Sequence, residues 1–172
     1  MSDRAALRTA VAAVRALYDA AACSLALVDE DGSTLVYVVA DGVGADEIVG
    51  VSLPVSRGIA GWTAMSGQPM VVSEVAADAR FARDVAESTH YVPTTILTAP
   101  LFDADGEASG VVSVLDPGVV ADREWTLAVL GTLAAVMGLL VATGDGTPGT
   151  EDQARLAALG RRVLDAVEDL GP

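Results

Sequence analysis

The chain has 172 residues, a length that favours one well-buried domain with a helical extension and leaves no room for a sensor joined to a full output domain. Its 24 acidic residues outnumber ten basic ones and give a formal net charge of -14, which argues against nucleic acids and anionic membrane surfaces as partners. All ten basic residues are arginine, so the lysine of P-loops, Schiff bases and pyridoxal enzymes is missing.

Cysteine and histidine each occur once, as Cys23 and His90. Two such ligands cannot build a protein-only zinc site of the usual kind, and one cysteine cannot form an internal disulfide, so we predict no metal site and a reducing compartment. The first ten residues read MSDRAALRTA and lack the hydrophobic region of a signal peptide. We therefore expect a cytoplasmic protein.

The first element is predicted to be a helix over residues 3–21. Its apolar stripe has helical spacing and consists of Leu7, Val11, Val14 and Leu17. Beyond it the period changes, because residues 23–42 and residues 94–116 each contain two β-prone runs around an Asp-Gly pair. Two such hairpins predict an antiparallel sheet, and residues 48–55 are predicted to add a further strand.

Three glycines punctuate the apolar stretch RGIAGWTAMSGQPMVV, residues 57–72. We predict a short helix that Ser56 caps and that ends at Gly67 in a left-handed conformation, followed by a strand over residues 70–72. The apolar side of this helix is predicted to consist of Ile59, Trp62 and Met65. Gly58 and Gly61 are expected to permit a close backbone approach, either to the protein or to a ligand.

Residues 75–93 are predicted to form a loop, a short helix and a second loop. Residues 125–143 carry no charge and are long enough to cross a bilayer. A capping Asp122 and the absence of a basic anchor favour a helix buried on several sides instead, so we expect no membrane contact. Residues 144–150 have the composition of a linker, and residues 151–172 are predicted to form a separate amphipathic helix.

These elements predict an α+β domain over residues 1–143. Their order resembles that of the GAF domain, a small-ligand sensory domain of many signalling proteins, bacterial ones among them. The resemblance covers residues 4–142 and rests on the glycine-punctuated helix before Pro69, the DARF stretch at residues 78–81, and the final hairpin that begins near Pro100. It implies a central antiparallel sheet with short helices on one face and long N- and C-terminal helices on the other, and a ligand pocket between the sheet and the short helices.

Three specialised branches of the family do not match. The segment ESTHYVPTTI has His90 but lacks the cysteine that attaches a bilin in light-sensing relatives. The chain has neither the Asn nor the Lys of the set found in cyclic-nucleotide-binding relatives. The relatives that reduce free methionine sulfoxide need several cysteines, and Cys23 is alone.

The resemblance places six candidate ligand-binding residues beside the pocket: Trp62, Arg80, Phe81, His90, Tyr91 and Thr98. For the aromatic residues the alternative is core packing, and for Arg80 it is a surface ion pair. His90 is the one side chain able to ligate haem, as a histidine in this region does in some redox sensor kinases. No set of nucleophile, base and orienting residue is present, so we predict no catalytic residues and leave the cofactor unknown.

The leading hypothesis is a non-enzymatic cytoplasmic signalling module that binds a small molecule or a partner protein and signals through its terminal helices to an effector in trans. Two alternatives stay open: a haem-bound gas or redox sensor that uses His90, and a dimerisation module with a vestigial pocket. A homodimer is expected, because the last helix of the domain is apolar on nearly every side. Small residues at four-residue spacing, Gly131 with Ala135 and Ala134 with Gly138, would permit close helix contact.

Overall fold

The computed structural model describes residues 4–118 and 123–143. Its elements, in chain order, are α1 (Arg4–Leu17), β1 (Ala20–Val28), β2 (Thr34–Gly42), α2 (Ala45–Ile48), β3 (Ser52–Pro54), α3 (Gly58–Ser66), β4 (Met70–Ser73), η1 (Val75–Ala77), α4 (Arg83–Ser88), β5 (Thr95–Phe102), β6 (Ala108–Pro117) and α5 (Arg123–Thr143). The strands form one six-stranded sheet in the order β3-β2-β1-β6-β5-β4, and every neighbouring pair is antiparallel. Both predicted hairpins are present, as β1-β2 and β5-β6.

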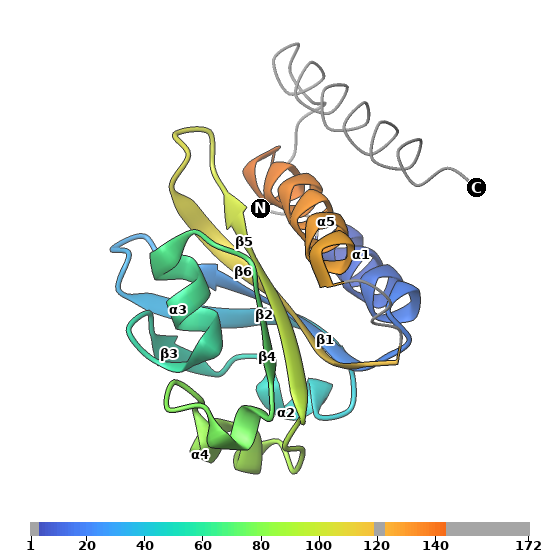
Figure 1. Cartoon of the computed structure of the whole chain (residues 1–172). Helices are drawn as coiled ribbons and strands as arrows, with labels where there is room; N and C mark the ends of the chain where they lie inside the picture. Colours follow the sequence, from blue (N-terminus) through green and yellow to red (C-terminus); the bar gives the residue numbers. More distant parts are fainter. Residues whose placement is uncertain (1–3, 119–122, 144–172) are drawn as a thin grey trace, which may run out of the picture.

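The sheet separates two layers of helices (Figure 1). The long helices α1 and α5 cover one face, on which α5 packs on β5 and α1 on β1 and β2. The short helices α2 and α3 and the α4 segment lie on the other side. The predicted α+β arrangement is therefore confirmed.

The three central strands β1, β6 and β5 are covered on both faces, and their side chains alternate between the two layers. The face toward α1 and α5 is filled by apolar side chains that are at most 1% exposed: Cys23, Leu25, Leu97, Ala99, Leu101, Val112 and Val114. The opposite face carries small and hydroxyl-bearing residues among its apolar ones, including Ser24, Thr98 and Ser113. The main core therefore lies under the long helices.

The two long helices are joined by a buried hydrogen bond. Tyr18, at the end of α1, is 4% exposed, and its hydroxyl donates to the carbonyl oxygen of Thr126 in α5 at 2.8 Å. Burial raises the pKa of Tyr18 to about 12, so the hydroxyl remains a neutral donor at physiological pH. Because this bond links residues 108 positions apart, α1 and α5 form one structural unit.

Three sequence-based boundaries are wrong. α1 ends at Leu17 and not at residue 21, because the chain turns at Asp19, whose φ is 46°, and Ala20 already pairs with β6. Residues 45–48 form the short helix α2, so the strand predicted over residues 48–55 shrinks to β3. Ser56 does not cap α3; its N-terminal cap position is Arg57, which makes no side-chain capping bond.

The buried side of α3 also differs from the prediction. Trp62 and Met65 are 47% and 66% exposed, whereas Ile59, Ala60, Gly61 and Thr63 are buried. The reason is Gly61: a β-carbon built there would lie 2.3 Å from the carbonyl oxygen of Val55. The close approach that the glycine permits is thus to the protein backbone, and Trp62 and Met65 face outward while Ile59 stays buried.

By length and composition, α5 meets the criteria for a membrane-spanning helix, and it is the one such helix in the described part of the chain. In the structure 28% of this segment is buried in the domain. Ala134 is completely buried, and a β-carbon at Gly138 would lie 2.9 Å from the Phe102 carbonyl oxygen, so this pair faces the sheet and not a second copy. The predicted cap Asp122, the linker 144–150 and the helix 151–172 lie outside the described residues.

The segment between α4 and β5 is held by one carboxylate. Asp116 accepts hydrogen bonds from the backbone N–H groups of Thr94 and Thr95 at 2.8 and 2.7 Å, and from the hydroxyl of Tyr91. Burial, followed by the neighbouring Asp116 carboxylate, raises the pKa of Tyr91 to about 12. The loop that carries Tyr91 is thereby fixed to the end of β6.

Gly61→Ala should lower the free energy of unfolding by about 1–3 kcal/mol, because the methyl group collides with a backbone carbonyl. This loss is expected despite a gain in helix propensity of about 1 kcal/mol. Gly67, whose φ of 63° confirms the predicted left-handed cap, should lose about 1–2 kcal/mol on replacement by alanine. The control is Gly131→Ala, since a β-carbon there meets nothing of its own chain within 4 Å; at concentrations low enough to keep the protein monomeric, the variant should be neutral or stabilised. Urea denaturation measures all three, and equal effects at Gly61 and Gly131 would contradict this account.

Asp116→Ala should destabilise the domain by about 2 kcal/mol, because three hydrogen bonds are lost, whereas Asp116→Asn keeps an acceptor and should lose about half as much. The raised pKa of Tyr91 adds a pH dependence. The stabilisation that comes from the raised pKa of Tyr91 should be fully present below pH 10, the pKa of an unfolded tyrosine. It should be lost from the free energy of unfolding as the pH rises to about 12. Thermal denaturation between pH 7 and pH 11 tests this: Tyr91→Phe should lose less stability over this range than the unmodified protein, although the raised pKa values of Tyr18 and Tyr37 leave a pH dependence in both.

Candidate functional site

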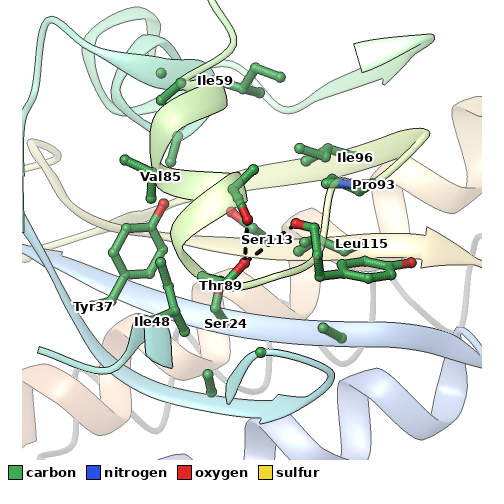
Figure 2. A pocket seen from close by; sticks show the side chains of 18 of the residues that line it. Ser24, Tyr37, Ile48, Ile59, Val85, Thr89, Pro93, Ile96, Ser113 and Leu115 are labelled. Carbon is green, nitrogen blue, oxygen red and sulfur yellow. Dashed lines mark hydrogen bonds between the residues drawn. The ribbon is translucent and has the colours of Figure 1, made fainter. Parts of the chain in front are cut away.

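A cavity lies between the sheet and the short helices. The volume in which the centre of a water molecule can be placed is about 100 Å³. One water needs roughly 10–15 Å³ on the same measure, so the cavity is several times larger than a water site. Its floor is formed by β1, β6 and β5, and its other walls by β2, α2, the start of α3 and the segment from residue 81 to residue 93 (Figure 2). The sheet face opposite the main core therefore encloses space for a small molecule.

Three hydroxyl-bearing residues cross the floor in a row. Ser24 in β1 pairs with Ser113 in β6, and Ser113 pairs on its other side with Thr98 in β5. All three are more than nine-tenths buried and all line the cavity. Cross-strand neighbours place their β-carbons about 5 Å apart, so the row provides a polar strip about 10 Å long on an otherwise apolar floor.

Thr98 has its own partner in this row. Its Oγ1 lies 2.6 Å from the Oγ1 of Thr63 in α3, and the Thr63 hydroxyl donates to the carbonyl oxygen of Ile59 at 3.0 Å. Thr98 must then be the donor to Thr63, because each hydroxyl has a single proton. This chain of bonds attaches α3 to the floor and leaves Thr98 an acceptor with no proton to offer.

Ser24 and Ser113 lack such partners. Across residues 4–118 and 123–143, neither hydroxyl makes a hydrogen bond to another group of the protein. Both residues are nevertheless buried, since Ser24 is 7% and Ser113 6% exposed. Neither serine oxygen is fully enclosed by protein, so both hydroxyls are accessible from the cavity and can bond with water or with another molecule inside it.

The remaining walls are largely apolar. They include Ile48 from α2, Val85 from α4 and Ile96 from β5, all labelled in Figure 2. Tyr37 rises from β2 into the same space, and its hydroxyl also has no hydrogen-bond partner in the described part of the chain. Burial raises the pKa of Tyr37 to about 12, so this hydroxyl is a neutral donor.

The charged residue among those lining the cavity is Arg57. Its guanidinium forms an ion pair with Asp84 of α4, and the two side chains are 47% and 62% exposed, so the pair lies at the solvent-facing rim. The side-chain hydrogen bond from Arg57 lowers the pKa of the Asp84 carboxyl. The pair links the start of α3 to α4, while the interior of the cavity has no charge of its own.

Three of the six predicted ligand-binding residues line the cavity: Phe81, Tyr91 and Thr98. Trp62 and Arg80 are not among the lining residues and instead contact each other, with the guanidinium carbon 5.0 Å from the indole centroid. Arg80 also forms a two-pronged ion pair with Asp78, at 2.9 and 2.6 Å, whose hydrogen bonds lower the pKa of Asp78 to about 2. Trp62 and Arg80 thus belong to a surface cluster beside the cavity.

His90 is also outside the cavity. It is exposed, adopts a left-handed backbone with φ of 58°, and follows α4 at the surface. An axial haem ligand must reach the iron from inside a pocket, so the placement of His90 does not fit the predicted haem site. We therefore assign no step to haem.

The most informative lining residues escaped the sequence analysis. Ser24, Ser113 and Tyr37 lie in β-prone runs where serine and tyrosine are unremarkable. The period of two does indicate that Ser24 and Ser113 lie on the side opposite Cys23 and Val114. What the pattern could not show is that this side faces a cavity and not tightly packed side chains.

A GAF domain family model matches residues 4–156. Solved structures with the same fold include a GAF domain of a phosphoenolpyruvate-protein phosphotransferase from Coxiella burnetii, with 19% identity over 80% of this chain and 81% of that one and a TM-score of 0.70. A free methionine-R-sulfoxide reductase from Neisseria meningitidis, in complex with its substrate, has 22% identity over 81% and 78% of the two chains and a TM-score of 0.65. The second GAF domain of DevS from Mycobacterium smegmatis has 19% identity over 94% and 99%, with a TM-score of 0.62.

At these identities the solved structures show the fold alone, and the family model supplies the assignment. The predicted resemblance is confirmed, both in the order of the elements and in the two helical layers around the antiparallel sheet. The chain belongs to the GAF domain family, whose members are small-ligand sensory and regulatory modules.

Proposed function

We propose that this protein is a non-enzymatic cytoplasmic sensory module that binds a small molecule in the cavity and signals through α1 and α5 to an effector in trans. The observation that carries the proposal is the cavity itself, whose floor carries the hydroxyls of Ser24 and Ser113, two groups without a hydrogen-bond partner in the described part of the chain. Sites of this kind combine apolar walls with a few placed polar groups. A vestigial pocket would be filled by side chains, so the open cavity favours ligand binding over the pure dimerisation module.

The route from the cavity to the helices is short. Ser24 faces the cavity, while its neighbours Cys23 and Leu25 pack in the core under α1 and α5. A ligand that moves β1 or β6 must therefore move the core on the other face, because close-packed interiors transmit displacement. The Tyr18 hydrogen bond to Thr126 makes α1 and α5 respond together.

Thiol chemistry of the kind implied by the methionine sulfoxide reductase relatives is not supported by the surroundings of Cys23. The residue is completely buried in the core under the long helices. Burial raises the pKa of its thiol to about 12, with a further contribution from Asp41, so the reactive thiolate does not form near neutral pH. This supports a binding role for the domain.

α5 also supports a homodimer as the signalling unit. On its outward side Leu140 is 37% exposed, and a β-carbon at Gly131 would meet nothing within 4 Å. Apolar surface on a helix is stabilised by burial, and α1 and α5 of a second copy would bury this surface by forming a four-helix bundle. Of the two predicted small-residue pairs, only Gly131 with Ala135 is available to such a contact, because Ala134 and Gly138 face the sheet.

Ala40→Leu tests the ligand site. Ala40 lines the cavity and pairs with Ser24 across β1 and β2, so a leucine there occupies the space that a ligand needs. After equilibrium dialysis against a bacterial small-molecule extract, the unmodified protein should retain a compound that Ala40→Leu retains at least tenfold less, by mass spectrometry. The control is Ala104→Leu, the same change at an exposed hairpin position. Equal retention by Ala40→Leu, with its fold intact by circular dichroism, would refute the proposed site.

The dimer is tested by light scattering at micromolar concentration, where twice the mass of the 17.4 kDa chain is expected. Leu140→Glu places a charge on the outward side of α5 and should shift the protein toward the monomer by at least tenfold in dissociation constant. Met65→Glu makes the same kind of change on α3, where Met65 is 66% exposed, and should leave the mass unchanged. A monomeric unmodified protein would exclude the four-helix bundle.

A further inference from the structure

The unpartnered hydroxyls on the cavity floor carry information about the ligand itself. Ser24 and Ser113 are cross-strand neighbours that both line the cavity, so their β-carbons lie about 5 Å apart on its floor. Each serine hydroxyl donates one hydrogen bond and accepts others. Two such groups in a row match a ligand edge that presents a donor next to an acceptor.

The neighbours of the two serines narrow the match. Thr98 on the Ser113 side has used its proton on Thr63 and remains an acceptor. Tyr37, from β2, provides a neutral hydroxyl donor in the same cavity. At the start of α3, residues 57–60 line the cavity and no side chain caps the helix, so its positive end favours a partial negative charge nearby. The cavity therefore has a hydrogen-bond acceptor at Thr98, and hydrogen-bond donors at Tyr37 and at the start of α3.

The residues that line the cavity include no unpaired charge that could form an ion pair with a charged ligand. Arg57 is the charged residue among those that line the cavity, and its ion pair with Asp84 at the rim cancels it. An anion would also enter against a chain whose formal net charge is -14. Moving an unpaired ion from water into such a site costs far more free energy than moving an amide that finds its hydrogen bonds.

We infer that the ligand is an uncharged small molecule with an amide-like edge, a carbonyl oxygen beside an N–H group, on an apolar body. The edge lies on Ser24 and Ser113, and the apolar body lies against Ile48, Val85 and Ile96. This inference rests on the proposed function, because it names the ligand class of the same cavity.

Three probes with one ring and different edges separate the possibilities: benzamide, which has the amide edge; benzoate, which has a carboxylate; and toluene, which has neither. Binding is followed by NMR through shifts of the backbone amides of Ser24, Thr98 and Ser113. Benzamide is expected to shift them at millimolar concentration, and benzoate to bind at least tenfold more weakly. Toluene is also expected to bind more weakly than benzamide. The ratio of the two dissociation constants measures what the hydrogen bonds of the amide group add to the affinity.

The variant Ser24→Ala/Ser113→Ala should weaken benzamide binding about tenfold or more and leave toluene binding unchanged. The same variant should melt at an equal or higher temperature when no ligand is present, because the two hydroxyls that it removes make no hydrogen bond to the described protein. Ser109→Ala is the matched control. Ser109 lies on β6 two residues after the turn-proximal Glu107, its buried hydroxyl also lacks a partner, and it does not line the cavity, so its removal should change no probe affinity.

The outcomes distinguish this inference from the proposed function. Binding of benzoate or of toluene as tight as that of benzamide overturns the amide-edge assignment and leaves the ligand site standing. The same holds if the double serine variant binds benzamide unchanged. If none of the three probes shifts the lining residues, both the assignment and the proposed ligand site fall.

Discussion

The double-sided burial of the central strands is the constraint on which the rest of the structure depends. β1, β6 and β5 have a helical layer on each face, so each residue on them must suit either the long helices or the short ones. Toward α1 and α5 the strands present side chains that are at most 1% exposed and fill the core. That face supplies most of the hydrophobic stabilisation, which allows the opposite face to be packed incompletely.

The incomplete packing on the second face has an identifiable origin. α3 lies close to the end of β3 at Gly61 and is tied to the floor through Thr63 and Thr98, so it covers one part of the sheet. α4 is a short helix, joined to the start of α3 by the exposed Arg57–Asp84 pair and followed by the loop that Asp116 holds. Elements anchored at their ends and bridged by a polar rim enclose a space that they do not fill, and the cavity results.

The sheet is then a single layer between the cavity on one face and the long helices on the other. Adjacent residues of a strand point to opposite faces of the sheet, so Cys23 lies in the core under the long helices and Ser24 lies at the cavity. The cavity and the long helices are therefore connected directly through the strands. The same alternation buries Cys23 where thiol chemistry has no access to solvent. Under the proposed function, occupancy of the cavity on one face would change the packing of the core on the other.

Local pattern by itself determined much of this protein: the two Asp-Gly hairpins, the amphipathic α1 and the left-handed cap at Gly67 all follow from short-range chemistry. The resemblance to the GAF domain, and not the local pattern, selected Phe81, Tyr91 and Thr98, which line the cavity. Tertiary structure decided the rest, because the direction of a side chain on a short helix or loop depends on what packs beneath it. Gly61 against Val55 turned Trp62 outward, the ion pair with Asp78 holds Arg80 at the surface, and the left-handed turn at His90 left the imidazole exposed. The importance of Ser24 and Ser113 became visible only with the cavity, since an unpaired hydroxyl is a property of its surroundings and not of its sequence.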